Sequence, residues 1–156
     1  MDKETGYIIT SFRSILEGQP WFGRAIMDIL QEINPGIVHK KPNKDAHSLN
    51  ELLWHMNTWA EFTLNRLSGD KEKDLAASEE LDWRVIDPAE NTWEKGLAEF
   101  KKTHDRIIAK LQTKKDDFLS GKVDYREYNF RFLLNGLIQH DIYHLGQIAY
   151  LKKLLS

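Results

Sequence analysis

Residues 133–155, with the sequence LLNGLIQHDIYHLGQIAYLKKLL, decide the expected fold of this chain. The stretch contains no proline and is long enough for about six helical turns. His140 and His144 are four residues apart, so on a helix they lie one turn apart on the same face. Imidazoles in this arrangement can converge on one metal ion. The rest of the chain is then expected to supply a third ligand, cover the site and leave an opening to it.

The composition limits the classes of function. The chain has 156 residues, which is most simply one domain over residues 1–156, and its net charge of -2 provides no basic surface for nucleic acid or membranes. Cysteine is absent, which excludes disulfides, thiolate metal ligands and a cysteine nucleophile and fits a reducing cytosol. The N-terminus lacks the pattern of a signal peptide, and no apolar run approaches the ~20 residues that span a bilayer. We therefore expect a cytoplasmic protein.

Amphipathic patterns predict four helical regions and little strand. Ser48 and Glu51 have the spacing of a capping box, so a helix should begin near Leu49 and end at Gly69. The other regions are expected over residues 7–33, as one bent helix or two short ones, from near Thr92 to 111, and from a cap at or near Asn129 to 155. This pattern is typical of an all-α four-helix bundle, in which metal sites are built from inward side chains on facing helices.

Two connecting segments are less regular. Residues 69–91 are charged and long for a loop in a compact bundle, which often marks a lid or a binding loop, and we expect Trp83, Val85 and Ile86 to anchor it. Alternating apolar residues within 114–130 permit a short extended piece.

The histidine pair is weak as a motif when taken alone, because two histidines can also flank a core stripe. Asp141 stands where a zincin helix would have glutamate, and it falls near the middle of the apolar face of its helix. A buried carboxylate is costly unless it is paired, so our hypothesis is that Asp141 accepts a hydrogen bond from an imidazole or another donor across the bundle and orients a ligand. The alternative is an aspartate that faces a wet crevice.

The third nitrogen has two candidates. His55 lies at the edge of the stripe of the 49–68 helix, and His104 lies within the apolar seam of the 92–111 helix. His104 can equally be a neutral, hydrogen-bonded core histidine. His39 and His47 fall in a proline-containing loop and are expected to be solvated or structural.

Three neighbours of these histidines are candidates to line the pocket or to support the ligands. Trp59 follows His55 by one turn and would wall the pocket, although a tryptophan at this spacing is more often a core residue. Gln147 and Tyr143 lie near the last-helix pair and would hydrogen-bond a ligand, or else be a surface and a packing residue.

The sequences WHMNTW at 54–59 and QHDIYHLGQI at 139–148, together with EGQPWFG at 17–23 and AHSLNELLWH at 46–55, resemble the DinB family of DinB/YfiT-like metalloenzymes. The resemblance implies an up-down-down-up four-helix bundle that is often a homodimer. It also implies a divalent metal ion held by three histidines, which in this sequence are His55, His140 and His144.

Three imidazoles leave at least one position open for water, a thiol or a substrate. Zinc or nickel is the expected metal, although imidazole also suits copper and iron. The resemblance implies metal-dependent transfer or hydrolysis on a small electrophilic substrate, with an external low-molecular-weight thiol as a further cofactor in some members. The alternatives are a non-catalytic metal-binding protein of stress response or interaction and a metal-free bundle.

Overall fold

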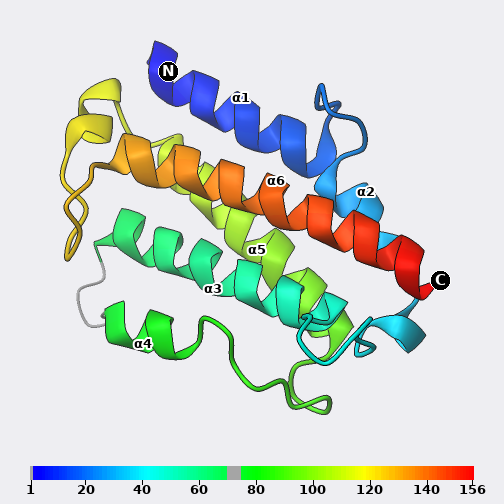
Figure 1. The fold of residues 1–156 in the computed structure, drawn as a ribbon. Helices are drawn as coiled ribbons and strands as arrows, with labels where there is room; N and C mark the ends of the chain where they lie inside the picture. The colour runs from blue at the N-terminus through cyan, green and yellow to red at the C-terminus, as the bar shows by residue number, and fades with distance from the viewer. Residues whose placement is uncertain (1, 70–74) are drawn as a thin grey trace.

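The computed structural model describes residues 2–69 and 75–156, and the regular elements within these ranges are helices (Figure 1). The prediction of an all-helical protein is thereby confirmed. The four long helices are α1 (Lys3–Glu17), α3 (Leu49–Ser68), α5 (Trp93–Leu111) and α6 (Phe130–Leu155). The shorter elements are α2 (Ile26–Gln31), α4 (Leu75–Glu80) and the 3₁₀ helices η1 (Pro35–Ile37) and η2 (Asp116–Ser120). Residues 70–74 of the expected connection lie outside the described residues.

The long helices surround one hydrophobic core. α3 packs against both α5 and α6, while α1 packs against α5 and α6 from the other side (Figure 1). The approach of α5 to α3 is close at Gly96, where an added Cβ would lie 2.8 Å from a methyl carbon of Leu53. Asn57 of α3 donates a side-chain hydrogen bond to the Gly96 carbonyl at 3.0 Å. This tight contact fixes the rotation of α3 and therefore the direction in which its side chains point.

Short-range hydrogen bonds explain where the long helices begin. Ser48 accepts from the Glu51 N–H at 3.1 Å, and the Glu51 carboxylate accepts from the Ser48 N–H at 2.6 Å, which completes the predicted capping box. Thr92 and Asn129 each accept from the backbone N–H three residues later, at 3.2 and 2.9 Å. Gly69 ends α3 with a left-handed φ of 70°, which glycine adopts without strain. All four boundaries agree with the sequence prediction.

Three sequence expectations need refinement. The first helical region consists of two helices, α1 and α2, because residues 18–25 leave the helical conformation. The expected extended piece is a tight turn, closed by an isolated bridge between Lys122 and Asn129, with Tyr125 at a φ of 63°. Val85 does not anchor its segment, since 94 % of the residue is exposed.

Among the described residues, no helix is long and apolar enough to cross a membrane.

Candidate metal centre

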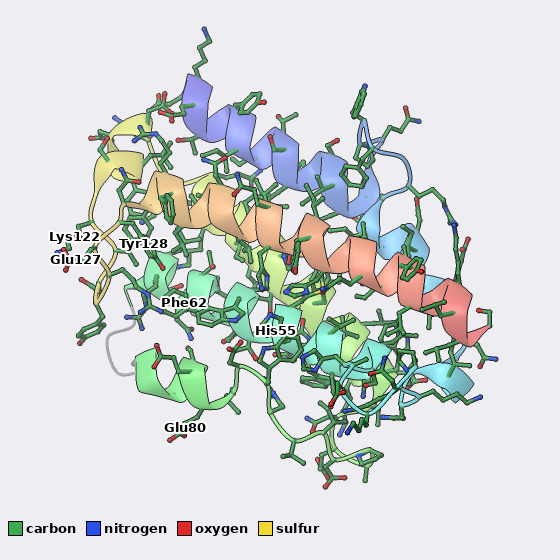
Figure 2. All side chains as sticks on the ribbon, viewed as in Figure 1. His55, Phe62, Glu80, Lys122, Glu127 and Tyr128 are labelled. Atoms are coloured by element: carbon green, nitrogen blue, oxygen red, sulfur yellow. The ribbon has the colours of Figure 1, made fainter. Side chains whose placement is uncertain are left out.

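Two facing helices bring three histidines together. His140 and His144 lie four residues apart on α6, and His55 lies in the second turn of α3, where Figure 2 labels it. His55 and His144 are buried, with 6 % of each residue exposed, while His140 is half-buried. Within the described part of the chain, these three residues form the group of side chains suited to hold a metal ion.

The three Nε2 atoms form a nearly equilateral triangle. The Nε2 of His55 lies 3.0 Å from those of His140 and His144, and the last two atoms are 3.1 Å apart. In a tetrahedral zinc site with Zn–N bonds of about 2.0–2.1 Å, two imidazole nitrogens lie about 3.3 Å apart. The observed spacing is therefore close to that of three ligands of one ion.

The outer ring nitrogens show where the protons are. The Nδ1 of His55 lies 3.1 Å from the carbonyl oxygen of Asp82 and 2.8 Å from its carboxylate oxygen, both of which can only accept. The Nδ1 of His144 donates to the side-chain oxygen of Gln147 at 2.6 Å. A neutral imidazole with its proton on Nδ1 carries a lone pair on Nε2. Two lone pairs therefore face each other at 3.0 Å, an arrangement that a cation between them stabilises.

The local environment keeps all three rings neutral. Burial, together with the like charge of the neighbouring His144 and His55, lowers the pKa of His140 to about 3. Burial also lowers the pKa of His55 and of His144, against the opposing effects of Asp82 on the first and Gln147 on the second. Neutral imidazole is the form that binds a metal ion, so these nitrogens need not lose a proton at neutral pH.

His104 is not part of this cluster. It is buried in α5, where its Nδ1 donates to the Phe100 carbonyl at 2.8 Å and its Nε2 lies 2.8 Å from the carboxylate of Asp141. Asp141 is fully buried, and burial raises the pKa of its carboxyl group against the effect of His104. The carboxylate therefore pairs with a core histidine across the bundle rather than with any of the three clustered histidines.

The three other candidates have different surroundings. Gln147 contacts His144 directly, as described above. Trp59 donates from its indole nitrogen to the carboxylate of Asp82 at 2.7 Å, so it reaches the cluster through that residue. Tyr143 is 64 % exposed, and its ring meets the His144 ring edge-on at a centroid distance of 5.0 Å.

Sequence reasoning missed the roles of Asp82 and of the Trp83 ring. Trp83 stacks on His55 with ring centroids 3.8 Å apart, and His47 stacks on the opposite face of Trp83 at 3.7 Å. Both Asp82 and Trp83 lie in the long segment before α5, and they cover one side of the cluster. The length of that segment and the presence of Trp83 were the available signals; no pattern pointed to Asp82.

The centre of the triangle is surrounded by three nitrogen atoms that could bind a metal ion. Within residues 2–69 and 75–156, no fourth histidine, aspartate or glutamate joins the group, and the chain has no cysteine. A three-nitrogen site with no further protein ligand is typical of metal centres that accept an exogenous ligand.

A comparison of the sequence with models of known protein families finds a match that covers the histidine cluster. The model of the DinB superfamily matches residues 23–148, which include all three histidines. A search of curated proteins finds no match. The chain belongs to the DinB superfamily, and its histidine cluster fits a metal-binding member.

Proposed function

We propose that this DinB-superfamily protein is a metal-dependent enzyme in which His55, His140 and His144 hold one divalent ion, with zinc or nickel preferred. The observation that carries the proposal is the direction of the lone pairs. The protons on Nδ1 of His55 and His144 point outward to Asp82 and Gln147, which leaves both Nε2 atoms free to bind. Fixing the tautomer through the outer nitrogen is the usual way in which proteins orient metal-binding imidazoles.

When bound, such an ion would act as a Lewis acid that lowers the pKa of a water or thiol and polarises a substrate oxygen. The residues of the chain orient and shield it. Asp82 and Gln147 hold two of the ligand rings, and Trp83 excludes water from one face of His55. His140 is half-buried, and we propose that a small molecule approaches the ion past this ring.

The reaction that best suits this arrangement is transfer or hydrolysis on a small electrophilic substrate. No protein nucleophile is needed, since the metal would activate the attacking group. Because the chain has no cysteine, any thiol must be an external low-molecular-weight compound. The alternative is a non-catalytic metal-binding protein, and it predicts that an added thiol or hydroxamate does not reach the bound ion.

Further properties of the chain belong to the same proposal. We propose one domain over residues 1–156 in which the long helices run up-down-down-up. In support, α1 and α6 run left to right in Figure 1, while α3 and α5 run the other way. The resemblance to the family supports a homodimer. The absence of cysteine fits a cytoplasmic location, and the net charge of -2 supports a small-molecule substrate rather than a nucleic-acid or membrane partner.

The metal content of variants tests the proposal. Wild-type protein incubated with zinc or nickel and then desalted should retain about one ion per chain. His55→Ala and His144→Ala should each lose the ion, since two imidazoles hold it far less tightly. His39→Ala is the matched control, because His39 is exposed and lies outside the cluster. Wild-type protein without stoichiometric metal, or equal retention by the His55→Ala variant, would overturn the proposal.

A further inference from the structure

A small apolar cavity adjoins the candidate metal centre. Its volume is about 160 Å³, and His140 forms part of its wall. Half of the other lining residues are aromatic: Trp59, Phe62, Tyr128 and Phe132. Figure 2 shows Phe62 and Tyr128 at the same end of the molecule. A larger groove of about 540 Å³ near α1 and α5 contains none of the three clustered histidines, so it is unrelated to the metal centre.

The cavity and the metal centre share their supporting residues. Trp59 lies one turn after His55 on α3, and Gly136 lies one turn before His140 on α6; both line the cavity. Asp82 accepts from the Trp59 indole at 2.7 Å and from the His55 ring at 2.8 Å. The same carboxylate thus fixes a wall of the cavity and a candidate ligand of the metal.

The lining offers little to a charged group. Among the described residues, no lysine, arginine, aspartate or glutamate lines the cavity. The indole N–H of Trp59 is already bound to Asp82, and the Thr63 hydroxyl donates to the Trp59 carbonyl at 2.9 Å. The Tyr128 hydroxyl accepts from the Arg126 side chain at 3.2 Å. The Tyr128 O–H and the His140 ring are the polar features that remain, and only His140 belongs to the cluster. A ligand placed here would therefore have an apolar body and a polar end directed to the metal.

We propose that this cavity selects substrates that carry one small apolar ring, of about the size of benzene, next to the electrophilic group that meets the metal. The volume supports the match in size, because a cavity of about 150 Å³ lined by apolar side chains accommodates benzene. This inference rests on the proposed metal-binding function, since the polar end of the substrate needs the ion.

Two hydroxamates test the proposal with a binding readout. Acetohydroxamate and benzohydroxamate bind zinc through the same head and differ in a methyl against a phenyl group. In calorimetric titrations of zinc-loaded protein, benzohydroxamate should bind about tenfold more tightly than acetohydroxamate, because its phenyl ring becomes buried in the cavity. Equal affinities on a protein that does hold zinc would overturn this inference alone, whereas failure to hold zinc would overturn the proposed function as well.

Glycine substitutions on α6 give a matched pair of variants. A Cβ at Gly136 or at Gly146 would meet no atom within 4 Å, so either position accepts a larger side chain, but only Gly136 lines the cavity. Gly136→Leu should reduce the affinity ratio of the two hydroxamates to about one by filling the cavity. It should leave zinc content and acetohydroxamate affinity unchanged. Gly146→Leu should keep the wild-type ratio.

A milder substitution guards against misfolding. Gly136→Ala adds one methyl group and should reduce the affinity ratio to a value between those of the wild type and Gly136→Leu. The inference fails if folded, zinc-loaded Gly136→Leu keeps the wild-type ratio of the two hydroxamate affinities. It fails likewise if Gly136→Ala shows no decrease in this ratio relative to Gly146→Leu and the wild type.

Discussion

The core histidine His104 and the cluster of His55, His140 and His144 differ in what their ring nitrogens face. Both ring nitrogens of His104 face oxygen acceptors, the Phe100 carbonyl and the Asp141 carboxylate, each at 2.8 Å. In the cluster of His55, His140 and His144, the Nε2 atoms face one another at 3.0–3.1 Å. In the first arrangement, protons form hydrogen bonds between the His104 nitrogens and the oxygen atoms. In the second, nitrogen lone pairs face one another, and a cation between them would stabilise them.

The comparison shows that burial alone does not identify a metal ligand. His104 is more buried than any of the three clustered histidines, yet all of its hydrogen-bonding capacity is used within the core. The informative feature is the partner of the outer nitrogen. Where the outer nitrogen of a buried histidine donates to a fixed acceptor and its inner nitrogen meets other imidazoles, the site is built to bind.

The largest effect on stability is expected from breaking the His104 pair. His104→Ala would leave Asp141 buried without its donor, so the free energy of unfolding should fall by about 3–5 kcal/mol. Urea unfolding of metal-free protein measures this loss. The double variant His104→Leu/Asp141→Leu should recover much of it, because two apolar side chains can replace a buried polar pair. In the same metal-free protein, His140→Ala should cost far less, because the Nδ1 of His140 has no hydrogen-bond partner among the described residues and its Nε2 faces two lone pairs. A loss as large as that of His104→Ala would contradict the comparison.

The pH dependence of metal-free protein provides the next test. The pKa of His140 is about 3 in the folded protein and has an ordinary value of 6.5 in the unfolded chain. Between these values the unfolded chain binds more protons, so the free energy of unfolding should fall as the pH decreases from 6.5 towards 3. The lowered pKa values of His55 and His144 act in the same direction. Between pH 7 and pH 5, the free energy of unfolding measured in urea should therefore fall less for the His140→Ala variant than for the wild type. An equal decrease in both proteins would contradict the buried environment assigned to His140.

A smaller effect is expected from the residue that orients His144. Gln147→Ala removes the acceptor at 2.6 Å from Nδ1 and should weaken zinc binding by about tenfold while leaving the stoichiometry at one. Competition with a zinc-sensitive dye measures the affinity. Gln139→Ala is the control, because Gln139 is exposed on the same helix. If both variants bind zinc as tightly as the wild type, the contact with Gln147 does not support the ligand.

Local sequence signals were sufficient for the helices. Ser48, Thr92 and Asn129 are residues that cap helices through their own side chains, and each begins a helix in the structure. The spacing of His140 and His144 likewise fixed their shared face on α6. These predictions succeeded because the interacting groups lie within four residues of each other.

Contacts between distant segments could not be predicted in the same way. The position of Asp141 on an apolar face indicated that it needs a donor, but did not decide that the donor is His104. His55 was assigned through the resemblance to the family rather than from its spacing. Asp82 reaches His55 from a segment 27 residues away, and that contact depends on how an irregular stretch folds back over α3. Such contacts are set by tertiary packing, which a single sequence does not display.

The central claim is that three imidazoles bind one ion and leave a position for an exogenous ligand. X-ray absorption spectroscopy of zinc-loaded protein, with and without acetohydroxamate, measures this directly. The account predicts three imidazole nitrogens at about 2.0–2.1 Å and a remaining oxygen ligand that changes when the hydroxamate is added. A spectrum with fewer than three imidazoles, or a coordination shell that the hydroxamate leaves unchanged, would contradict it.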